Sequence, residues 1–308
     1  MLVFVCDHDS YSKYRQKRYR DLSDSLLPVH RKVRRFGKAL ADFGRREKES
    51  VMDQRERRKF LIRELLQEQI QYRGMEIPDG EEEQKRLLRG LLNVRLPGKI
   101  GREFLRVQDA YLQEELSAKG ITELDDLKPV CLGLYLWQGD ITTLRCDAIV
   151  NAANSGMTGC YVPNHRCIDN CIHSFSGIQL RIDCAEMMRL QGHEEQPGKA
   201  KITKAYNLPC RYILHTVGPV ISSPLTKADC DLLAGCYRSC LELASENHLE
   251  SVAFCCISTG EFHFPNEKAA QIAVSTVRAF MQNKTSVKKV IFNVFRELDR
   301  EIYRKLLG

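Results

Sequence analysis

The first regular pattern of apolar residues along the chain begins near residue 52 and has the spacing of a helix. Over residues 52–71 the sequence MDQRERRKFLIRELLQEQIQ places its apolar side chains near one face of a helix. These side chains are Phe60, Leu61, Leu65 and Ile70. The pattern predicts an amphipathic helix that begins at about Met52.

Two further helices are predicted before residue 125. Asp79 precedes the run EEEQKRLLRGLLN, which is typical of an N-cap followed by an acidic first turn, and Pro97 and Gly98 end that helix. A third helix is expected from about Glu103 to Ala118, before Gly120. We interpret residues 52–128 as a small helical module, with a role in packing or in covering the substrate.

From Pro129 the pattern changes to short β-branched or aromatic runs that alternate with helices. The predicted strands are Leu132–Trp137, Ala148–Asn151, Tyr212–Val217, Val252–Ile257 and Val290–Phe295. The predicted helices lie near residues 167–190, 226–247, 266–282 and 297–307. This alternation indicates an α/β fold with a mixed central sheet covered by helices over 129–308, in which ligands bind where loops leave the carboxyl ends of strands.

Residues 1–51 do not match either pattern. They combine an apolar start with an Arg-rich run, so they are interpreted as an N-terminal extension or as a start codon assigned too far upstream. The first 50 residues hold 13 Lys and Arg against 7 Asp and Glu and supply 13 − 7 = +6 of the net charge of +7. The remainder is nearly neutral, which disfavours nucleic-acid binding by the folded part.

The positions of the cysteines and the hydropathy of the chain indicate the cellular compartment in which the protein works. Twelve of the 13 cysteines lie between Cys131 and Cys256, mostly inside apolar segments, and this indicates buried free thiols in a reducing compartment. No apolar run approaches the roughly 20 residues that a membrane helix needs, and no signal peptide is recognisable. We therefore expect a cytoplasmic protein that does not interact with a membrane.

Cys160, His165 and Cys167 form a denser group on one predicted loop. Two thiolates and an imidazole suit tetrahedral Zn²⁺, and three protein ligands leave a fourth position for water or substrate. The residues alone leave open a second interpretation, in which these are ordinary buried cysteines and a surface histidine.

Polar residues at the ends of predicted strands are further candidates, each with a structural alternative. Asp140 could contact an adenine amine, or cap its own turn. Ser258, Thr259 and Gly260 could surround an anionic diphosphate with N–H groups, although Gly260 could serve the turn alone. Asn154 ends an apolar run, where a buried amide needs partners. Asp169 could act beside a metal, or be the N-cap of the next helix.

Four segments in register over residues 130–307 resemble the macrodomain family. They are QGDIT (138–142) with DAIVNAAN (147–154), IDNCIHSFSG (168–177), HTVGP (215–219) and CISTGEFHFPNEKAA (256–270). The longer loop SGMTGCYVPNHRC, together with the helical module, resembles the zinc-containing branch of microbial macrodomains. The resemblance covers nearly everything after Met52.

The resemblance implies a role for each candidate. Asp140 and Ile141 would bind adenine, Ser258, Thr259, Gly260, Glu261 and Phe262 would surround the diphosphate, and Asn154 would hold the distal ribose. Zn²⁺ would be bound by Cys160, His165 and Cys167, and Asp169, with Asn154, would be catalytic by positioning or activating the hydrolytic water. Asn151, Cys171, His173 and His215 are expected to be structural.

The implied function is a zinc-dependent hydrolase that removes ADP-ribose from ester-linked acidic side chains of mono-ADP-ribosylated proteins, with O-acetyl-ADP-ribose deacetylation as a side activity. Zinc would act as a Lewis acid on a ribose or carbonyl oxygen, or lower the pKa of a bound water. The resemblance also suggests as partner a lipoyl-carrier protein modified by a sirtuin-type transferase. The alternatives are a non-catalytic ADP-ribose-binding module and a nucleic-acid-binding protein.

Overall fold

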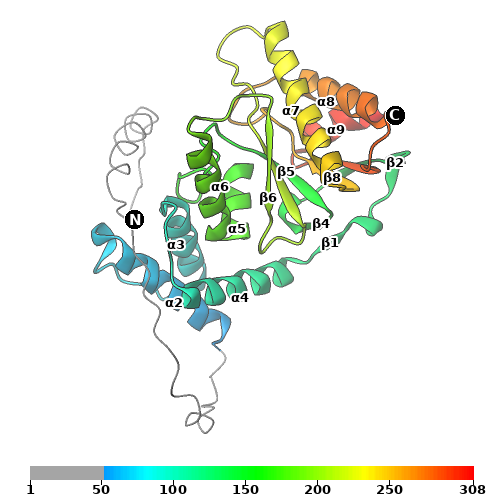
Figure 1. Ribbon diagram of the computed structural model, residues 1–308. Helices are drawn as coiled ribbons and strands as arrows, with labels where there is room; N and C mark the ends of the chain where they lie inside the picture. Colours follow the sequence, from blue (N-terminus) through cyan, green and yellow to red (C-terminus); the bar gives the residue numbers. More distant parts are fainter. Residues whose placement is uncertain (1–51) are drawn as a thin grey trace, which may run out of the picture. The chain divides into compact units, whose positions relative to one another are not determined.

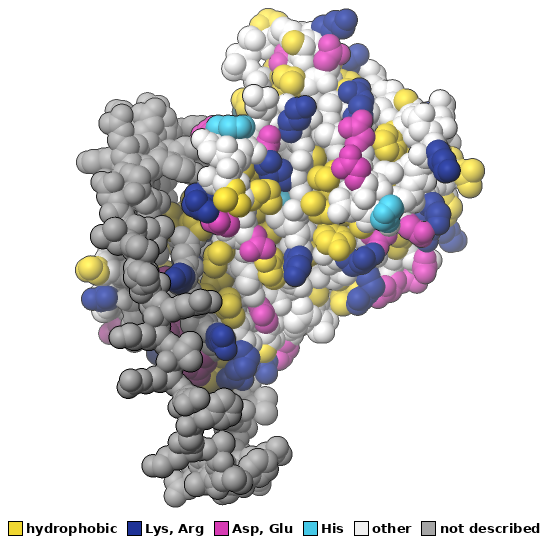
Figure 2. Space-filling model, viewed as in Figure 1, with side chains coloured by type: hydrophobic (Ala, Val, Ile, Leu, Met, Phe, Trp, Pro, Cys, Tyr) yellow, Lys and Arg dark blue, Asp and Glu magenta, His cyan; other side chains and the backbone are white. Residues whose placement is uncertain are grey.

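The computed structural model describes residues 52–308, so the predicted N-terminal extension lies outside the described residues. Residues Gln54–Gly308 form one compact unit. No helix in this part of the chain has the length and hydrophobicity needed to cross a membrane. On the face drawn in Figure 2, the acidic and basic side chains of the described residues are interspersed.

The first helices form around buried leucines. They are α2 (Gln54–Glu68), the short 3₁₀ helix η1 (Ile70–Tyr72), α3 (Glu81–Val94) and α4 (Arg102–Lys119). The helix α2 packs against both α3 and α4, and it buries Leu61 and Leu65 between them. The N-cap of α3 is Gly80 and no side chain caps the helix, so the prediction that Asp79 is the N-cap is wrong.

Seven strands form a mixed sheet in the order β2-β3-β9-β8-β5-β7-β6. They are β2 (Pro129–Cys131), β3 (Leu134–Gln138), β5 (Ala148–Ala152), β6 (Ala200–Lys204), β7 (Tyr212–Thr216), β8 (Ser251–Phe254) and β9 (Lys289–Val294). The two outer strands β2 and β6 run antiparallel to their neighbours, and the inner pairings are parallel. A separate parallel pair joins β1 (Thr122–Glu123) to β4 (Leu144–Arg145), and a 3₁₀ turn, η2 (Leu124–Asp126), follows β1.

Helices cover both faces of the sheet, as the parallel strands require. The helices α5 (Ile168–Ser176) and α6 (Ile178–Gln191) lie on one side, and α7 (Lys227–Glu246), α8 (Asn266–Met281) and α9 (Glu297–Leu307) lie on the other (Figure 1). The predicted α/β fold with a covered mixed sheet and preceding helices is therefore confirmed. The helical stretch expected near 167–190 is divided at Gly177, whose φ of 101° interrupts the helical backbone.

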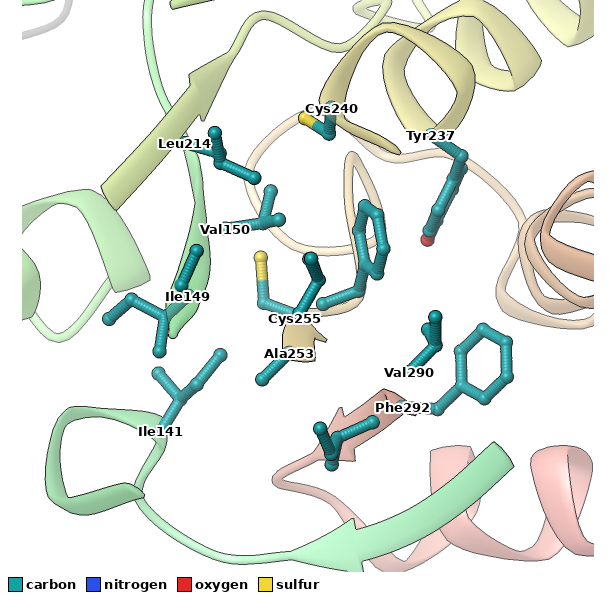
Figure 3. Close-up of a cluster of buried hydrophobic side chains, with 14 of the residues drawn as sticks. Ile141, Ile149, Val150, Leu214, Tyr237, Cys240, Ala253, Cys255, Val290 and Phe292 are labelled. Atoms are coloured by element: carbon teal, nitrogen blue, oxygen red, sulfur yellow. The ribbon is translucent and has the colours of Figure 1, made fainter. Parts of the chain in front are cut away.

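The core is apolar on both faces of the sheet. Neighbouring residues of β5 point to opposite faces, so Ile149 lies toward Ile141 while Val150 lies toward Leu214 and Cys240 (Figure 3). All five of these side chains are buried. This two-sided burial explains why the central strands read as continuous apolar runs in the sequence.

Arg181 of α6 ties the helical module to the sheet-containing part. Its Nη1 donates hydrogen bonds to the carbonyls of Leu92, Asn93 and Arg95, at 3.2, 2.7 and 2.6 Å. These carbonyls lie at the end of α3, where a helix leaves acceptors without partners. Arg181 is buried, and its guanidinium caps the C-terminus of α3 from the neighbouring helix α6.

We predict that Arg181→Met lowers the free energy of unfolding by about 3 kcal/mol, because it leaves buried carbonyls without donors. Urea denaturation followed by circular dichroism would measure the loss. Arg189→Met is the matched control, since Arg189 lies on the same helix and pairs with Glu186 at the surface. Equal effects of the two substitutions would contradict the capping role.

Candidate active site

The polar candidates meet at one edge of the sheet. The strands β3, β9, β8 and β5 are parallel neighbours, so the loops that leave their carboxyl ends lie side by side. Asp140 follows β3, Asn154 follows β5, and Ser258 follows β8. The fold therefore brings these residues to the edge at which ligands bind in α/β folds.

The Asp169 carboxylate is buried, with 4% of the residue exposed, and two amides hold it. The Nδ2 group of Asn151 donates to Oδ1 at 2.8 Å, and that of Asn154 donates to Oδ2 at 3.0 Å. Asp169 is the second residue of α5, whose N-cap is Cys167, so the alternative interpretation of Asp169 as the N-cap is wrong. Its position in the first turn instead places a carboxylate at the positive end of the helix dipole.

Burial outweighs these favourable contacts in setting the protonation of Asp169. Removal from water raises the pKa of Asp169 to about 6, while the hydrogen bonds from Asn151 and Asn154 act in the opposite direction. A carboxyl group in this range can both accept and release a proton near neutral pH. The arrangement is therefore suited to general acid or base chemistry.

Asn154 links Asp169 to the loop that contains the Cys and His candidates. Besides the bond to Asp169, its Nδ2 group donates to the carbonyl of Gly159 at 3.1 Å, and its Oδ1 accepts from the N–H of Gly156 at 3.0 Å. Asn154 is only partly buried, so its side chain still borders the open edge of the sheet.

The three predicted metal ligands lie together. The ligand atoms of Cys160, His165 and Cys167 are all within 4.8 Å of one another, and Cys160 Sγ is 3.5 Å from His165 Nδ1. A tetrahedral zinc ion with bonds of about 2.3 Å to sulfur and about 2.05 Å to nitrogen places these atoms about 3.6 Å apart. The group therefore fits a metal ion of this kind with little movement.

The two cysteines have pKa values that shift in opposite directions. A hydrogen bond from the Cys167 thiol, aided by His165, lowers the pKa of Cys160 to about 5. The same hydrogen bond, together with burial, raises the pKa of Cys167. A lowered pKa favours the thiolate form of Cys160, which is the form that binds a metal cation.

A second His/Cys group lies behind Asp169. Its members are His173, Cys184 and His215, and their ligand atoms are also close enough to hold a metal ion. His215 already uses both ring nitrogens, since Nδ1 is 3.1 Å from Asn151 Nδ2 and Nε2 is 2.8 Å from Thr203 Oγ1. A metal ion bound by His215 would therefore have to replace one of these two contacts.

The helical module directly contacts the loop that carries Cys160, His165 and Cys167, which is the candidate metal-binding loop. From α3, Arg89 Nη2 donates to the carbonyl of His165 at 2.7 Å and to Asn170 Oδ1 at 3.1 Å. Asn93, one turn further along α3, accepts from the N–H of Asn164 at 2.9 Å. The sequence analysis did not identify Arg89 and Asn93, because only the packing of α3 reveals their partners.

Asp140 serves its own turn. Its Oδ1 accepts from the N–H and hydroxyl of Thr142, at 3.0 and 2.6 Å, as the N-cap of the 3₁₀ helix η3 (Ile141–Thr143). Its Oδ2 faces Lys119 Nζ at 3.5 Å and remains accessible enough to accept another donor. Ile141 is buried, with 2% of the residue exposed. The structural alternative for Asp140 is thus observed, and it leaves one oxygen for an adenine amine.

The loop 258–264 is closed by its own backbone. The N–H of Phe264 donates to Ser258 O at 2.9 Å, and the N–H of His263 donates to Gly260 O at 3.1 Å. Among residues 52–308, none accepts a hydrogen bond from the N–H groups of Gly260, Glu261 or Phe262. These N–H groups could bind an anion, whereas the N–H of Thr259 already donates to Cys256 O at 3.4 Å. The role of this segment in diphosphate binding stays a prediction.

Two side chains at this edge have positions that the sequence analysis did not foresee. Glu261 Oε1 lies 3.5 Å from Nε2 of His165, so this residue faces the metal-binding loop. Phe295, which follows β9, is 79% exposed, and its carbonyl accepts from Gln138 Nε2 of the neighbouring strand β3 at 3.3 Å. Phe295 could have been noticed from the sequence, because it is an aromatic residue directly after a predicted buried strand.

Comparisons with known proteins show which family this chain is similar to. A family profile described as Macro domain matches residues 150–273. The chain is 60% identical over 261 residues to a protein-ADP-ribose hydrolase of Treponema medium. This match covers 83% of this chain and 100% of that protein. A Staphylococcus aureus (strain MSSA476) protein of the same name is 49% identical, over 83% of this chain and 97% of its own. The solved Trypanosoma brucei macrodomain in complex with ADP-ribose superimposes with a TM-score of 0.56 at 31% identity, covering 71% of this chain and 95% of that one.

We predict that Gly159→Ala disturbs the metal-binding loop and lowers the free energy of unfolding by about 2–4 kcal/mol. Gly159 has a φ of 85°, and an added Cβ would lie 2.7 Å from the buried His173 ring. Gly98→Ala is the control, because no atom lies within 4 Å of its added Cβ. Chemical denaturation of both variants would measure the difference, and a Gly159→Ala protein as stable as the control would contradict the packing described here.

Proposed function

The chain belongs to the macrodomain family, and on this basis we propose that it is a zinc-dependent hydrolase that cleaves the ester between ADP-ribose and an acidic side chain of a protein. We identify it as a protein-ADP-ribose hydrolase because it is 60% and 49% identical to the two bacterial hydrolases. The ester linkage, the use of zinc and the deacetylation of O-acetyl-ADP-ribose are the proposed refinements.

One observation carries the proposal: the Asn154 side chain joins the buried Asp169 carboxylate to the backbone of the loop that holds Cys160, His165 and Cys167. Binding of ADP-ribose alone requires neither a carboxylate whose burial raises its pKa to about 6 nor a Cys/His group beside it. The juxtaposition is expected when a proton must be moved next to an electrophilic centre.

The remaining residues would hold ADP-ribose. The Oδ2 atom of Asp140, which Lys119 also approaches at 3.5 Å, would accept from the adenine amine, and the exposed Phe295 ring would stack on the base. The N–H groups of Gly260 and its neighbours would bind the diphosphate, and Asn154 would orient the distal ribose. In this pose the scissile ester lies at the Asp169 end of the sheet edge.

Zn²⁺ held by Cys160, His165 and Cys167 would supply a Lewis acid for the substrate or for the attacking water. The side chains of the protein do the rest. Asn154 holds the ribose against the edge of the sheet, and Asp169 positions water and accepts its proton. The Asn151 and Asn154 amides keep the Asp169 carboxylate aimed at the reacting bond.

Two other functions make different predictions for the same protein. A non-catalytic ADP-ribose-binding module would bind ADP-ribose without releasing it from a modified protein, and a nucleic-acid-binding protein would retain DNA or RNA. Incubation of the full chain with an ADP-ribosylated protein, and separately with nucleic acid, distinguishes them. A lipoyl-carrier protein modified by a sirtuin-type transferase is the proposed natural substrate, to be compared in that assay with other acidic ADP-ribosylated proteins.

We predict about one zinc ion per chain, because three ligands fit one tetrahedral ion. Elemental analysis of protein purified without added metal would test this stoichiometry. Chelation should abolish turnover while reducing ADP-ribose affinity much less. Cys167→Ala should lose the metal, whereas Cys230→Ala, a partly buried cysteine on α7, should retain it. Undiminished zinc in Cys167→Ala would refute the ligand assignment.

Asp169→Ala should lower kcat by about 10²- to 10⁴-fold, the range for the loss of general acid–base assistance. Its effect on ADP-ribose affinity should be small, because adenine and diphosphate are bound elsewhere. Single-turnover hydrolysis and calorimetric binding would separate the two effects, with Asp231→Ala on the exposed face of α7 as control. Unchanged turnover of a folded, zinc-loaded Asp169→Ala protein would remove Asp169 from the mechanism.

A further inference from the structure

The His165 ring is approached from two sides by groups of different chemistry. Its Nδ1 lies 3.5 Å from Cys160 Sγ, on the side where the three ligand atoms converge. Its Nε2 lies 3.5 Å from Oε1 of Glu261, which belongs to the loop after β8. The two ring nitrogens therefore face two different loops.

An imidazole can bind a metal only through a deprotonated nitrogen, and the N–H on the other nitrogen is then free to donate a hydrogen bond. A carboxylate that accepts this hydrogen bond fixes the tautomer and the ring orientation, and it makes the ligand more basic. We propose that Glu261 is a positioning residue for His165: its carboxylate holds the proton on Nε2, so that Nδ1 is presented to the metal. This inference rests on the metal site of the proposed function.

The backbone on both sides of this contact is already fixed. Arg89 of α3 holds the carbonyl of His165 at 2.7 Å, so rotation of the side chain is the main freedom that the ring retains. The loop that carries Glu261 is closed by its internal hydrogen bonds, and the N–H of Ile221 donates to Phe262 O at 2.9 Å. The Glu261 side chain is 68% exposed, so the fixed backbone of its loop is what keeps its carboxylate near the His165 ring.

The contact also joins the two halves of the proposed site. Glu261 lies between Gly260 and Phe262, whose N–H groups are the proposed diphosphate donors, and its side chain faces the metal-binding loop. A displacement of this loop by the diphosphate would move the Glu261 carboxylate relative to His165. Metal affinity and ADP-ribose affinity are then coupled, and by linkage the coupling is the same in both directions.

The test is the affinity of the full chain for Zn²⁺, measured by competition with a chromophoric chelator. Glu261→Ala should weaken binding about 10- to 100-fold, the usual effect of removing a carboxylate that orients a metal-bound histidine. Glu261→Gln, which keeps an acceptor oxygen at the same length, should lose less. Glu267→Ala is the control, because Glu267 is exposed in the first turn of the next helix. Absorption of bound Co²⁺ should shift in Glu261→Ala and not in the control.

A double variant shows whether Glu261 acts through His165. In a His165→Ala background, Glu261→Ala should cause no further loss of Zn²⁺ affinity, whereas independent effects would add. Equal melting temperatures of the metal-free proteins would exclude a general loss of structure, and Glu261→Gln serves if Glu261→Ala does not fold.

The possible failures are distinct. If the unaltered chain binds no Zn²⁺, the metal site of the proposed function is wrong and this inference falls with it. If it binds Zn²⁺ and Glu261→Ala binds it equally well, only the inference is overturned. It is also overturned if Glu261→Ala weakens ADP-ribose binding to the metal-free protein while leaving Zn²⁺ affinity unchanged, because Glu261 would then contact the ligand and not act through His165.

Discussion

A carboxylate buried at the carboxyl end of β5 constrains the arrangement around it. A charged group removed from water is stable only where donors are directed at it, and the amides of Asn151 and Asn154 meet this need for Asp169. Asp169 lies in the first turn of α5, two residues after the N-cap Cys167. The end of the candidate metal-binding loop and the buried carboxylate are therefore joined within one turn of α5.

The rest of the metal-binding loop is fixed by segments that are distant in the sequence. Arg89 and Asn93 of α3 contact its backbone, and Arg181 of α6 in turn supplies donors to the end of α3. The helical module is thus part of the wall of the site and not merely an appended cover. This relationship gives a physical reason for a loop containing several polar groups to keep one conformation.

The hydrophobic pattern was sufficient to predict the main elements of the fold. The five apolar strands and the long helices of the sheet-containing part are present close to the predicted positions, because buried strands and amphipathic helices impose continuous or periodic spacing on the sequence. The outer strands β2 and β6 were not predicted. Edge strands are partly exposed, so their residues carry less apolar signal. The break between α5 and α6 was also missed, although Gly177 was a readable signal for it.

The sequence by itself determined the class of fold and the candidate metal-ligand group, because the three Cys and His candidates lie within eight residues and need only a local loop to meet. It also located the polar residues at the strand ends. Only the tertiary structure decided which of these residues touch: that Asn151 supports Asp169, that Arg89 holds the backbone of His165, and that Glu261 faces its ring. Such contacts depend on strand order and helix packing over long separations. Hydrophobic periodicity records which side of an element is buried, but it does not record which distant side chain lies opposite.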